Sequence, residues 1–531
     1  MKNVPMLRGI FIFLLIFTST FAYSSTYYIA VDGDDANSGT IESPLASIHK
    51  AQELVVPGDT VFIRGGTYKL TDDDISNVYQ NLFACISFLD KSGTALKMIN
   101  YWNYPGETPV FDFSAVKPAD QRVVGIYVRG SYLHFRGLEM TGIQVTITTH
   151  TESYCIYSRG SHNIYERMSF HDNKGTGLRH YGGGYNLFVY CDSYRNHDDV
   201  SENKKGGNTD GFGCHPSKGG VGNVFLGCRS WFNSDDGYDC IRAQEPIVFD
   251  HCESFYNGYS TSFQSLADGN GFKAGGFAHD AAADIPDPVP SHTVRFCLAV
   301  RNKANGFYSN HHLTGDKWYN NTAYANAVNF NMVNRESPEL DNLWVNGYDH
   351  VLINNLSFKG RSSETAYIDT AQNTLKTNSW DSDVIVSSAD FASLDEKLLV
   401  EPRRADGSLP KTDFMRLTSY SDLIDKGTDI GFPFEGAAPD LGAFEYHIPT
   451  GIGSLKTKKR SFSMYPNPTT DVLYLNIDHL NKVKILDLAG KSYLAHFSQN
   501  QVNVSSLPRG TYVLMVYADN QYMGANRFVK L

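Results

Sequence analysis

The sequence predicts an all-β chain in which a solenoid of parallel β-strands is followed by a small β-sandwich. The first observation is a short phrase that leads from a small or apolar residue through a hydrophobe to an asparagine. The asparagines that end its six copies are Asn173, Asn196, Asn233, Asn257, Asn302 and Asn326. They are 23, 37, 24, 45 and 24 residues apart. A unit of about two dozen residues therefore recurs, as in the coils of a solenoid.

The second observation is that apolar and polar residues alternate at period two inside each repeat, as in residues 228–231 and 248–252. This alternation is typical of strands and not of helices. Equivalent positions of successive coils should then stack at about 4.8 Å, the spacing between neighbouring strands. Residues far apart in the sequence therefore become predictable neighbours.

The asparagine column is interpreted as a structural ladder. Asn tolerates the left-handed conformation of a tight corner, and stacked side-chain amides can hydrogen bond to one another. A second column is expected to be small and buried, and it consists of Cys191, Cys228, Cys252 and Cys297. No CxxC motif occurs, so a zinc site is not expected. The sequence does not exclude a disulfide between adjacent coils, because the Cα atoms of stacked cysteines come within bonding range.

Four segments are predicted along the chain. Residues 1–22 have the basic start, apolar run and small-residue end of a signal peptide. A membrane anchor is the alternative, but the apolar run is too short to span a membrane comfortably. Residues 23–446 form the solenoid, residues 447–462 a linker, and residues 463–531 the β-sandwich. No later segment could span a membrane, so an exported protein without a membrane span is expected.

Within the solenoid, residues 47–54 read as a short helix capped by Ser47, which would cover the edge of the first coil. Coils are expected to continue to about Phe358, and the stretch up to Phe444 is expected to close the C-terminal end. The net charge of −11 argues against a nucleic-acid partner, because no basic stripe is present to bind phosphates.

A second register follows the asparagines, and its constant element is Gly followed by an apolar residue. Its copies begin at Thr176, Asp210, Asp236, Asn270 and Asn305. Three residues later stand Arg179, Gly213, Asp239, Lys273 and Tyr308. Winding is thus expected to stack Asp210 on Asp236 and to put Lys273 beside Asp239 on the next coil.

Four carboxylates should crowd into one corner of the solenoid, those of Asp210, Asp235, Asp236 and Asp239. They would repel one another strongly unless a cation were bound. Ligands that offer only oxygen favour a hard ion, and their loose arrangement suits Ca²⁺ better than Mg²⁺. A solvated Asp-Asp-Gly turn and a purely structural calcium are the alternatives.

Lys273 is the candidate catalytic base. Next to a bound dication its pKa should fall, and a neutral amine could then take a carbon-bound proton. The C5 proton of a uronate, which is α to the carboxylate, is acidic enough, and loss of the group at C4 would complete a β-elimination. Arg179, His215 and Arg242 fall near the same face and could hold further substrate carboxylates, although each could equally be a surface residue.

Two stretches resemble known families. The sequences Tyr465-Pro-Asn-Pro468, Asp487-Leu-Ala-Gly490 and Arg509-Gly-Thr-Tyr512 resemble the C-terminal sorting domain of the type IX secretion system of Bacteroidetes. That resemblance implies the type IX secretion machinery as a partner, with final residence at the cell surface or in the medium.

Residues 27–445 resemble polysaccharide lyase family 9, on the motifs Asn208-Thr-Asp-Gly-Phe212, Ser234-Asp-Asp-Gly-Tyr-Asp239 and Asp268-Gly-Asn-Gly-Phe-Lys-Ala-Gly-Gly276. Members are right-handed parallel β-helices that cleave pectic galacturonans. The resemblance implies an acidic pectic polysaccharide as substrate, calcium ligands at the four aspartates and the Brønsted base at Lys273.

Three functions are compared. The preferred one is a calcium-dependent lyase acting on polygalacturonate or on rhamnogalacturonan I, between which the sequence does not decide. The second is a glycoside hydrolase on the same scaffold, with aspartates as acid and base. The third is a glycan-binding surface protein without catalysis.

Overall fold

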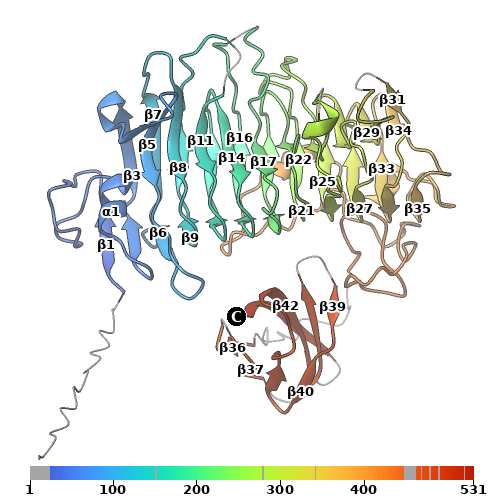
Figure 1. Ribbon diagram of the computed structural model, residues 1–531. Coiled ribbons are helices and arrows are strands. Elements are labelled where there is room, and N and C mark those ends of the chain that lie inside the picture. Colours follow the sequence, from blue (N-terminus) through green and yellow to red (C-terminus); the bar gives the residue numbers. More distant parts are fainter. Residues whose placement is uncertain are drawn as a thin grey trace, which may run out of the picture.

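The computed structural model describes residues 24–530, except 150–151, 202, 278–279, 341–342, 448–461, 468, 478–479, 488–490 and 519–520. The predicted signal peptide and nearly all of the predicted linker lie outside the described residues. The predicted solenoid is confirmed: the chain winds into a long parallel β-helix with three sheets along its length (Figure 1).

The first sheet has twelve strands, and each one pairs in parallel with the next coil. In spatial order they are β1 (Thr26–Ile29), β2 (Thr60–Ile63), β6 (Ile99–Asn103), β9 (Leu133–Arg136), β12 (Ile164–Glu166), β15 (Leu187–Val189), β18 (Asn223–Leu226), β21 (Ile247–Asp250), β24 (Thr293–Arg295), β27 (Lys317–Tyr319), β32 (Val351–Ile353) and β35 (Thr374–Lys376).

The second sheet has ten strands. They are β3 (Gly66–Thr71), β7 (Pro109–Ala115), β10 (Glu139–Thr141), β13 (Ser169–His171), β16 (Asp192–Tyr194), β19 (Arg229–Trp231), β22 (Glu253–Phe255), β25 (Leu298–Val300), β28 (Thr322–Tyr324) and β33 (Leu356–Phe358).

The third sheet has eleven strands, and all of its pairs are parallel except β4 with β5. They are β4 (Asn77–Tyr79), β5 (Phe83–Leu89), β8 (Arg122–Val128), β11 (Tyr154–Ser158), β14 (Thr176–Gly182), β17 (Phe212–Pro216), β20 (Tyr238–Asp239), β23 (Phe272–Lys273), β26 (Asn305–Tyr308), β29 (Val328–Asn331) and β34 (Ser363–Ala366). Coils thus continue beyond Phe358, to β35.

Stacked aromatic rings fill the interior of the solenoid. On the first sheet, Tyr101, Phe135, Tyr165, Phe188, Phe225 and Phe249 stack in that order, with ring centroids 4.3–5.3 Å apart. On the third sheet, Phe212, Tyr238, Phe272, Phe307 and Phe330 do the same at 4.7–5.3 Å. The rings of the third sheet, except that of Phe330, are the apolar residues of the Gly-apolar register, so their burial turns the flanking polar columns outward.

The predicted asparagine ladder is confirmed. From Asn173 to Asn302, each side-chain amide donates to Oδ1 of the asparagine on the next coil, at 2.8 Å from Asn173 to Asn196 and 3.0 Å from Asn233 to Asn257. The left-handed residue, however, is the one before each asparagine, such as Asp172 and Phe232, each with φ 53°. The asparagine is therefore selected by its buried amide and not by its backbone angles.

All eight cysteines are buried and free. The column from Cys191 to Cys297 is confirmed as small buried side chains, with the backbone N–H of Cys252 3.3 Å from Sγ of Cys297. The structure thus answers the open question of a disulfide between coils, because no cysteine is bridged in it.

The N-terminal helix is confirmed as α1 (Ile48–Leu54). Oγ of Ser47 accepts a hydrogen bond from the backbone N–H of Lys50 at 3.0 Å, and Ile48 and Ala51 are buried against the solenoid core. Short 3-10 turns occur at Asp72–Asp74, Ala282–Asp284, Ser388–Asp390 and Glu396–Val400.

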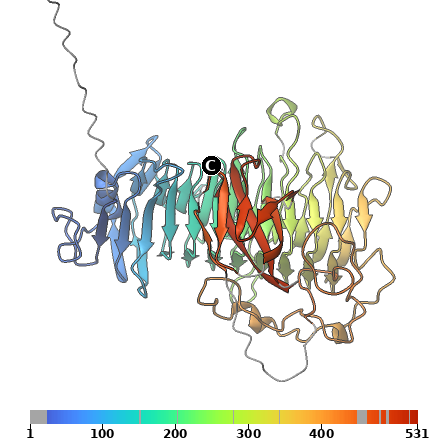
Figure 2. The ribbon, with the colours of Figure 1, turned by 90° about the horizontal axis from the view of Figure 1, so that it is seen from below.

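The stretch after the last coil was expected to close the C-terminal end of the solenoid. Most of it does not, because it runs along the second sheet. Its first residues do close that end, since Trp380 packs on Phe330 with centroids 4.8 Å apart. Residues 391–441 then pack against outward side chains of the second sheet, including Phe255 and Leu298. Figure 2 shows this brown segment along the solenoid. Arg403 anchors it to Asp192 at 2.6 Å.

The C-terminal β-sandwich is confirmed as two antiparallel sheets that share a core of Leu473, Ile485, Val502, Leu514 and Phe528. One sheet has β36 (Met464–Tyr465), β37 (Val472–Leu475), β41 (Gln501–Asn503) and β40 (His496–Ser498). The other has β39 (Ser492–Tyr493), β38 (Leu480–Asp487), β42 (Gly510–Ala518) and β43 (Gln521–Lys530). β30 (Asn334–Arg335) and β31 (Trp344–Val345) form a small antiparallel pair. Among the described residues, no helix is long and apolar enough to cross a membrane.

Candidate functional site

The candidate site lies on the outward face of the third sheet, at β17, β20 and β23. Strand pairing aligns Arg179 with Gly213, Gly213 with Asp239, Asp239 with Lys273, and Lys273 with Tyr308. The first column, which contains Asp210 and Asp236, is held by a side-chain contact. Oδ1 of Asp210 accepts a hydrogen bond from the backbone N–H of Asp236 at 3.1 Å. The two columns expected from the repeat are therefore present.

Lys273 reaches into the carboxylates. Its Nζ donates to Oδ2 of Asp239 at 3.1 Å and lies 3.1 Å from Oδ2 of Asp236. One carboxylate oxygen each from Asp210, Asp236 and Asp239 lies within 4.8 Å of the others. The structure thus brings together Lys273 and three of the four predicted ligands.

Asp235 is buried beside them, but backbone groups occupy both of its oxygens. Oδ2 accepts from the N–H of Asn208 at 2.6 Å, and Oδ1 accepts from the N–H of Asp268 at 3.0 Å. These donors belong to the two insertions that interrupt the repeat. Asp235 therefore fixes both insertions at the rim of the site.

Burial and mutual repulsion govern the charges of the site. Burial raises the pKa of Asp210 and of Asp236, and burial together with the charge of Asp236 raises the pKa of Asp235 to about 8. Burial acts in the same direction on Asp239, but the Lys273 ammonium outweighs it and lowers the pKa of Asp239. Ionised together, the four carboxylates would carry more negative charge than one lysine offsets, and this repulsion adds to burial in raising the pKa of Asp210, Asp235 and Asp236.

The pKa of Lys273 lies well above its usual value in the protein alone. Burial lowers this pKa, but the four aspartates, Asp239 foremost, outweigh burial. The sequence predicted a lowered pKa because it assumed a bound dication. Without the charge of a dication, the four carboxylates raise the pKa of Lys273 instead of lowering it.

The donor set fits a divalent cation. Oδ2 of Asp236 is buried and accepts no hydrogen bond from the described residues, although Nζ of Lys273 lies near it. An orphaned carboxylate oxygen among two other carboxylates is a ligand position for a hard cation. The residues that could hold the ion are Asp210, Asp236 and Asp239, with Asp235 beside them.

The outward column has no side chain between Arg179 and Asp239, because that position is Gly213; this gap in the column is called the hollow, and the ring of His215 lies against it. A Cβ at Gly213 would lie 2.9 Å from Nε2 of His215 and 3.5 Å from Cγ of Arg179. Nδ1 of His215 donates to the carbonyl of Ile241 at 2.6 Å, so Nε2 carries the lone pair. Burial lowers the pKa of His215 to about 3, so its ring is neutral and offers an acceptor to the hollow.

The two predicted arginines are both ion-paired. Arg179 contacts the carboxylate of Glu152, and its Nη1 lies 3.3 Å from the hydroxyl of Tyr154. Arg242 is exposed and pairs with Asp280 at 2.7 Å. Arg179 therefore borders the hollow, whereas Arg242 lies among the exposed side chains outside it.

Sequence reasoning missed Glu152 and Asp280, the acids that bind these two arginines. Both lie in irregular segments, where no repeat assigns a position. Gly213 is the one glycine of the second column, but the period of that column carries no signal that the ring of His215 lies against it.

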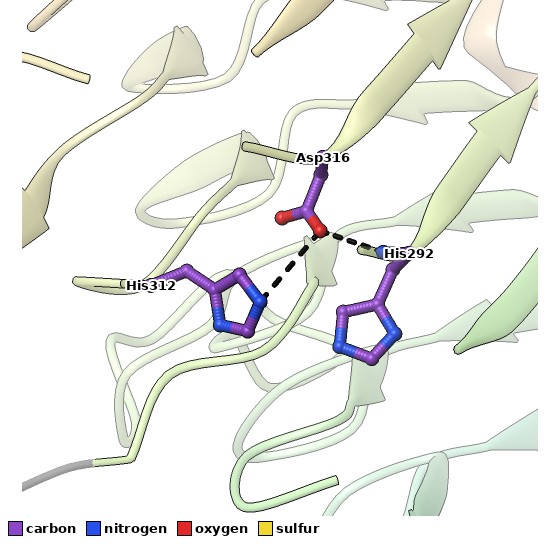
Figure 3. A group of neighbouring side chains, drawn as sticks. All are labelled: His292, His312 and Asp316. Atoms are coloured by element: carbon purple, nitrogen blue, oxygen red, sulfur yellow. Dashed lines mark hydrogen bonds and ion pairs between the residues drawn. The ribbon is translucent and has the colours of Figure 1, made fainter. Parts of the chain in front are cut away.

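A second cluster of possible metal ligands is formed by His292, His312 and Asp316, all fully buried (Figure 3). The backbone N–H of Ile247 donates to Nδ1 of His292 at 3.2 Å, and that of Gly276 donates to Nδ1 of His312 at 2.9 Å. Each neutral ring must then carry its proton on Nε2, which leaves no lone pair for a metal.

This second cluster instead extends a hydrogen-bond ladder along the first sheet. The backbone N–H of Asn163 donates to Asn186, that of His292 to Asp316, and that of Asp316 to His350, at 2.8–2.9 Å. Each coil supplies one acceptor to the N–H of its neighbour. His292 and His350 therefore replace ladder asparagines, whereas His312 lies beside the ladder and accepts from Gly276.

Comparisons with known proteins agree with this architecture. Residues 27–358 match the family described as Pel9A-like, right handed beta helix region, and residues 463–530 match the secretion system C-terminal sorting domain. Pectate lyase L of Dickeya dadantii is 34% identical over 435 residues, which cover 81% of this chain and 92% of that protein.

Two solved structures are similar as well. A rhamnogalacturonan lyase is 41% identical with a TM-score of 0.71, covering 75% of this chain and 97% of its own. Pectate lyase Pel9A is 32% identical with a TM-score of 0.64, covering 81% of this chain and 98% of its own. The resemblance stated from the motifs is thereby confirmed, as is the right-handed β-helix.

The sorting domain assigns the protein to the secreted or cell-surface class. The acidic outward face, the parallel coils and the matched relatives together define its family. The chain belongs to the Pel9A-like right-handed β-helix family and is a polysaccharide lyase that carries a C-terminal secretion sorting domain.

Proposed function

We propose that this lyase cleaves a pectic galacturonate-containing backbone by calcium-dependent β-elimination, with Lys273 as the base. The observation that carries the proposal is the position of Nζ of Lys273, 3.1 Å from both Asp236 and Asp239. An amine placed among three clustered carboxylates is suited to proton abstraction beside a cation.

We assign the cation to Asp210, Asp236 and Asp239, with Asp235 next to them. When bound there, Ca²⁺ would neutralise these carboxylates and withdraw electrons from a substrate carboxylate, which stabilises negative charge on its α carbon. Lys273 in its neutral form then accepts the C5 proton of the uronate. The C4–O bond breaks with its electron pair on the leaving oxygen, and a C4–C5 double bond forms.

The hollow at Gly213 would receive part of the sugar beside the reacting uronate. Because the ring of His215 is neutral and its Nε2 carries a lone pair, we expect it to accept a hydrogen bond from a sugar hydroxyl. Arg179, which borders the hollow, would orient a carboxylate after partial release from Glu152.

The names of the relatives favour a lyase over the two alternatives. A hydrolase or a non-catalytic glycan-binding protein would require the relatives named pectate lyase and rhamnogalacturonan lyase to differ from this chain in function. Relatives of both names match, so polygalacturonate and rhamnogalacturonan I are both candidate substrates.

The test is incubation of purified protein with each polymer, with and without calcium, while the absorbance of unsaturated ends is followed. Calcium-dependent absorbance with one of the polymers is expected. Saturated ends, or activity unaffected by a chelator, would contradict the proposal.

We also propose that the chain is exported through the type IX secretion machinery, and that the lyase domain ends at residue 446 and the sorting domain begins at residue 463.

A further inference from the structure

Two exposed arginines stand on the outward face of the third sheet, on the N-terminal side of the acidic cluster. Arg129 follows β8 and Arg159 follows β11. The backbone N–H of Arg129 donates to the carbonyl of Leu89 at 2.8 Å, and that of Arg159 donates to the carbonyl of Val128 at 2.7 Å. Both residues therefore continue the parallel pairing of the sheet.

The register places them in line with the proposed site. Val128 pairs with Ser158 and Ser158 with His180, so Arg129, Arg159 and Tyr181 occupy equivalent positions on successive coils. Tyr181 pairs with His215, which points into the hollow at Gly213. At about 4.8 Å per coil, Arg159 lies about 10 Å from His215 along the solenoid axis.

Neither guanidinium has an acidic partner among the described residues, although the net charge of the chain is −11. Several other arginines do have one, as Arg64 has Glu107, Arg195 has Asp172 and Arg301 has Glu396. The two arginines thus supply uncompensated positive charge on the face that carries the proposed site.

Aromatic rings support both guanidinium groups. Arg129 lies 6.0 Å from the ring centroids of Tyr79 and Phe88, and Arg159 lies 5.3 Å from that of Tyr181. The ring of Tyr181 is 40% exposed. Stacking on a ring holds the planar group in place and limits the entropy lost when it binds an anion.

We propose that Arg129, Arg159 and Tyr181 form a distal subsite, which binds a uronate carboxylate several sugar residues from the bond that is cleaved. Arg159 binds the uronate carboxylate through its paired N–H groups, and Arg129, on the adjacent coil, adds a second positive charge to this subsite. The exposed ring of Tyr181 contacts the sugar that lies between this carboxylate and the hollow. The inference rests on the proposed function and deepens it: the preferred ligand is an extended polyuronate and not a short fragment.

The test compares the double variant Arg129→Gln/Arg159→Gln with the parent on whichever of the two polymers the parent cleaves and on a trimer cut from that polymer. The distal subsite requires about a tenfold higher KM for the polymer, with kcat within about twofold and no change for the trimer. Arg404→Gln, at an exposed arginine of the segment on the second sheet, is the matched control and should change nothing. The single variant Arg159→Lys should recover part of the affinity that Arg159→Gln loses.

Two outcomes would overturn the distal subsite: an unchanged KM for the polymer in the double variant, or an equal rise for polymer and trimer. The salt dependence of polymer binding, measured by affinity electrophoresis in the Lys273→Ala background, should also weaken when both arginines are removed. Failure of the proposed function gives a different result, because the parent would then form no unsaturated ends on either polymer. A parent that is active, with a double variant indistinguishable from it, overturns the distal subsite alone.

Discussion

Nζ of Lys273 and Oδ2 of Asp239 lie 3.1 Å apart on paired positions of adjacent coils, although 34 residues separate them in the sequence. The contact puts the amine of Lys273 against carboxylates that hold its pKa well above the usual value. Lys273 could therefore have two roles that experiments can separate. As an ammonium it balances the charge of the carboxylates, and as a neutral amine it would accept a proton from the substrate.

Replacement of Lys273 separates those roles. Lys273→Ala should lower kcat by about 10²–10⁴-fold, the usual contribution of a general base. Lys273→Arg keeps the positive charge but cannot lose its proton near neutral pH, so it should be as inactive as the alanine variant. Lys317→Ala, at an exposed lysine of β27, is the control. Recovery of activity in Lys273→Arg would mean that the lysine only balances charge.

Asp236→Asn tests the cation site. The amide keeps an oxygen for the backbone N–H of Asn270, which donates to Oδ1 at 2.7 Å, but it removes the charge of a fully buried carboxylate. We expect the calcium concentration for half-maximal activity to rise at least about tenfold. Calcium should also raise the Tm of the parent by mass action and raise that of the variant much less.

The matched control for this change is Asp199→Asn, at an exposed aspartate that pairs with Lys174 at 2.5 Å. Its calcium requirement should equal that of the parent. An Asp236→Asn variant with the calcium response of the parent would show that the cation lies elsewhere.

Gly213→Ala tests the hollow. The new methyl group would meet Nε2 of His215 at 2.9 Å, so the ring must move from the position in which it would accept a sugar hydroxyl. KM for the polymer should rise about tenfold while kcat changes little, because the base and the acids are untouched. Gly207→Ala, where a Cβ meets nothing within 4 Å, should behave as the parent. A fall in kcat at unchanged KM would contradict a role in substrate binding.

The acidic columns could be predicted because a solenoid turns sequence register into contact. Asp210, Asp236, Asp239 and Lys273 all belong to the repeating unit, and the structure aligns them as the repeat requires. The orientation of Asp235 could not be predicted, because its partners are backbone groups of Asn208 and Asp268 in insertions without a period.

The same reason explains the other differences. Residues 391–441 have no repeat, so their course over the second sheet depends on single anchors such as the pairing of Arg403 with Asp192. The left-handed residue before each ladder asparagine varies in type, from Asp172 to Phe232, so composition gives no signal for it.

The last prediction concerns acid stability and the histidines of the first-sheet ladder. Burial, and then the neighbouring His312, lower the pKa of His350 from 6.5 to about 3. Below pH 6.5 the unfolded chain therefore binds a proton at this residue that the folded chain does not bind. Stability from this group is complete above about pH 6.5 and is lost as the pH falls towards 3, with a slope of about 1.4 kcal/mol per pH unit.

His350→Asn removes that proton and keeps the ladder, since an asparagine in this column can still accept from the N–H of Asp316, as Asn373 accepts from the N–H of His350 at 2.9 Å. Urea unfolding midpoints measured from pH 7.5 to pH 4 should therefore fall less steeply in the variant than in the parent. His496→Asn, at an exposed histidine of the sorting domain, should leave the dependence unchanged. An identical slope in His350→Asn and the parent would show that this imidazole does not govern the loss of stability in acid, and that other buried groups must carry it.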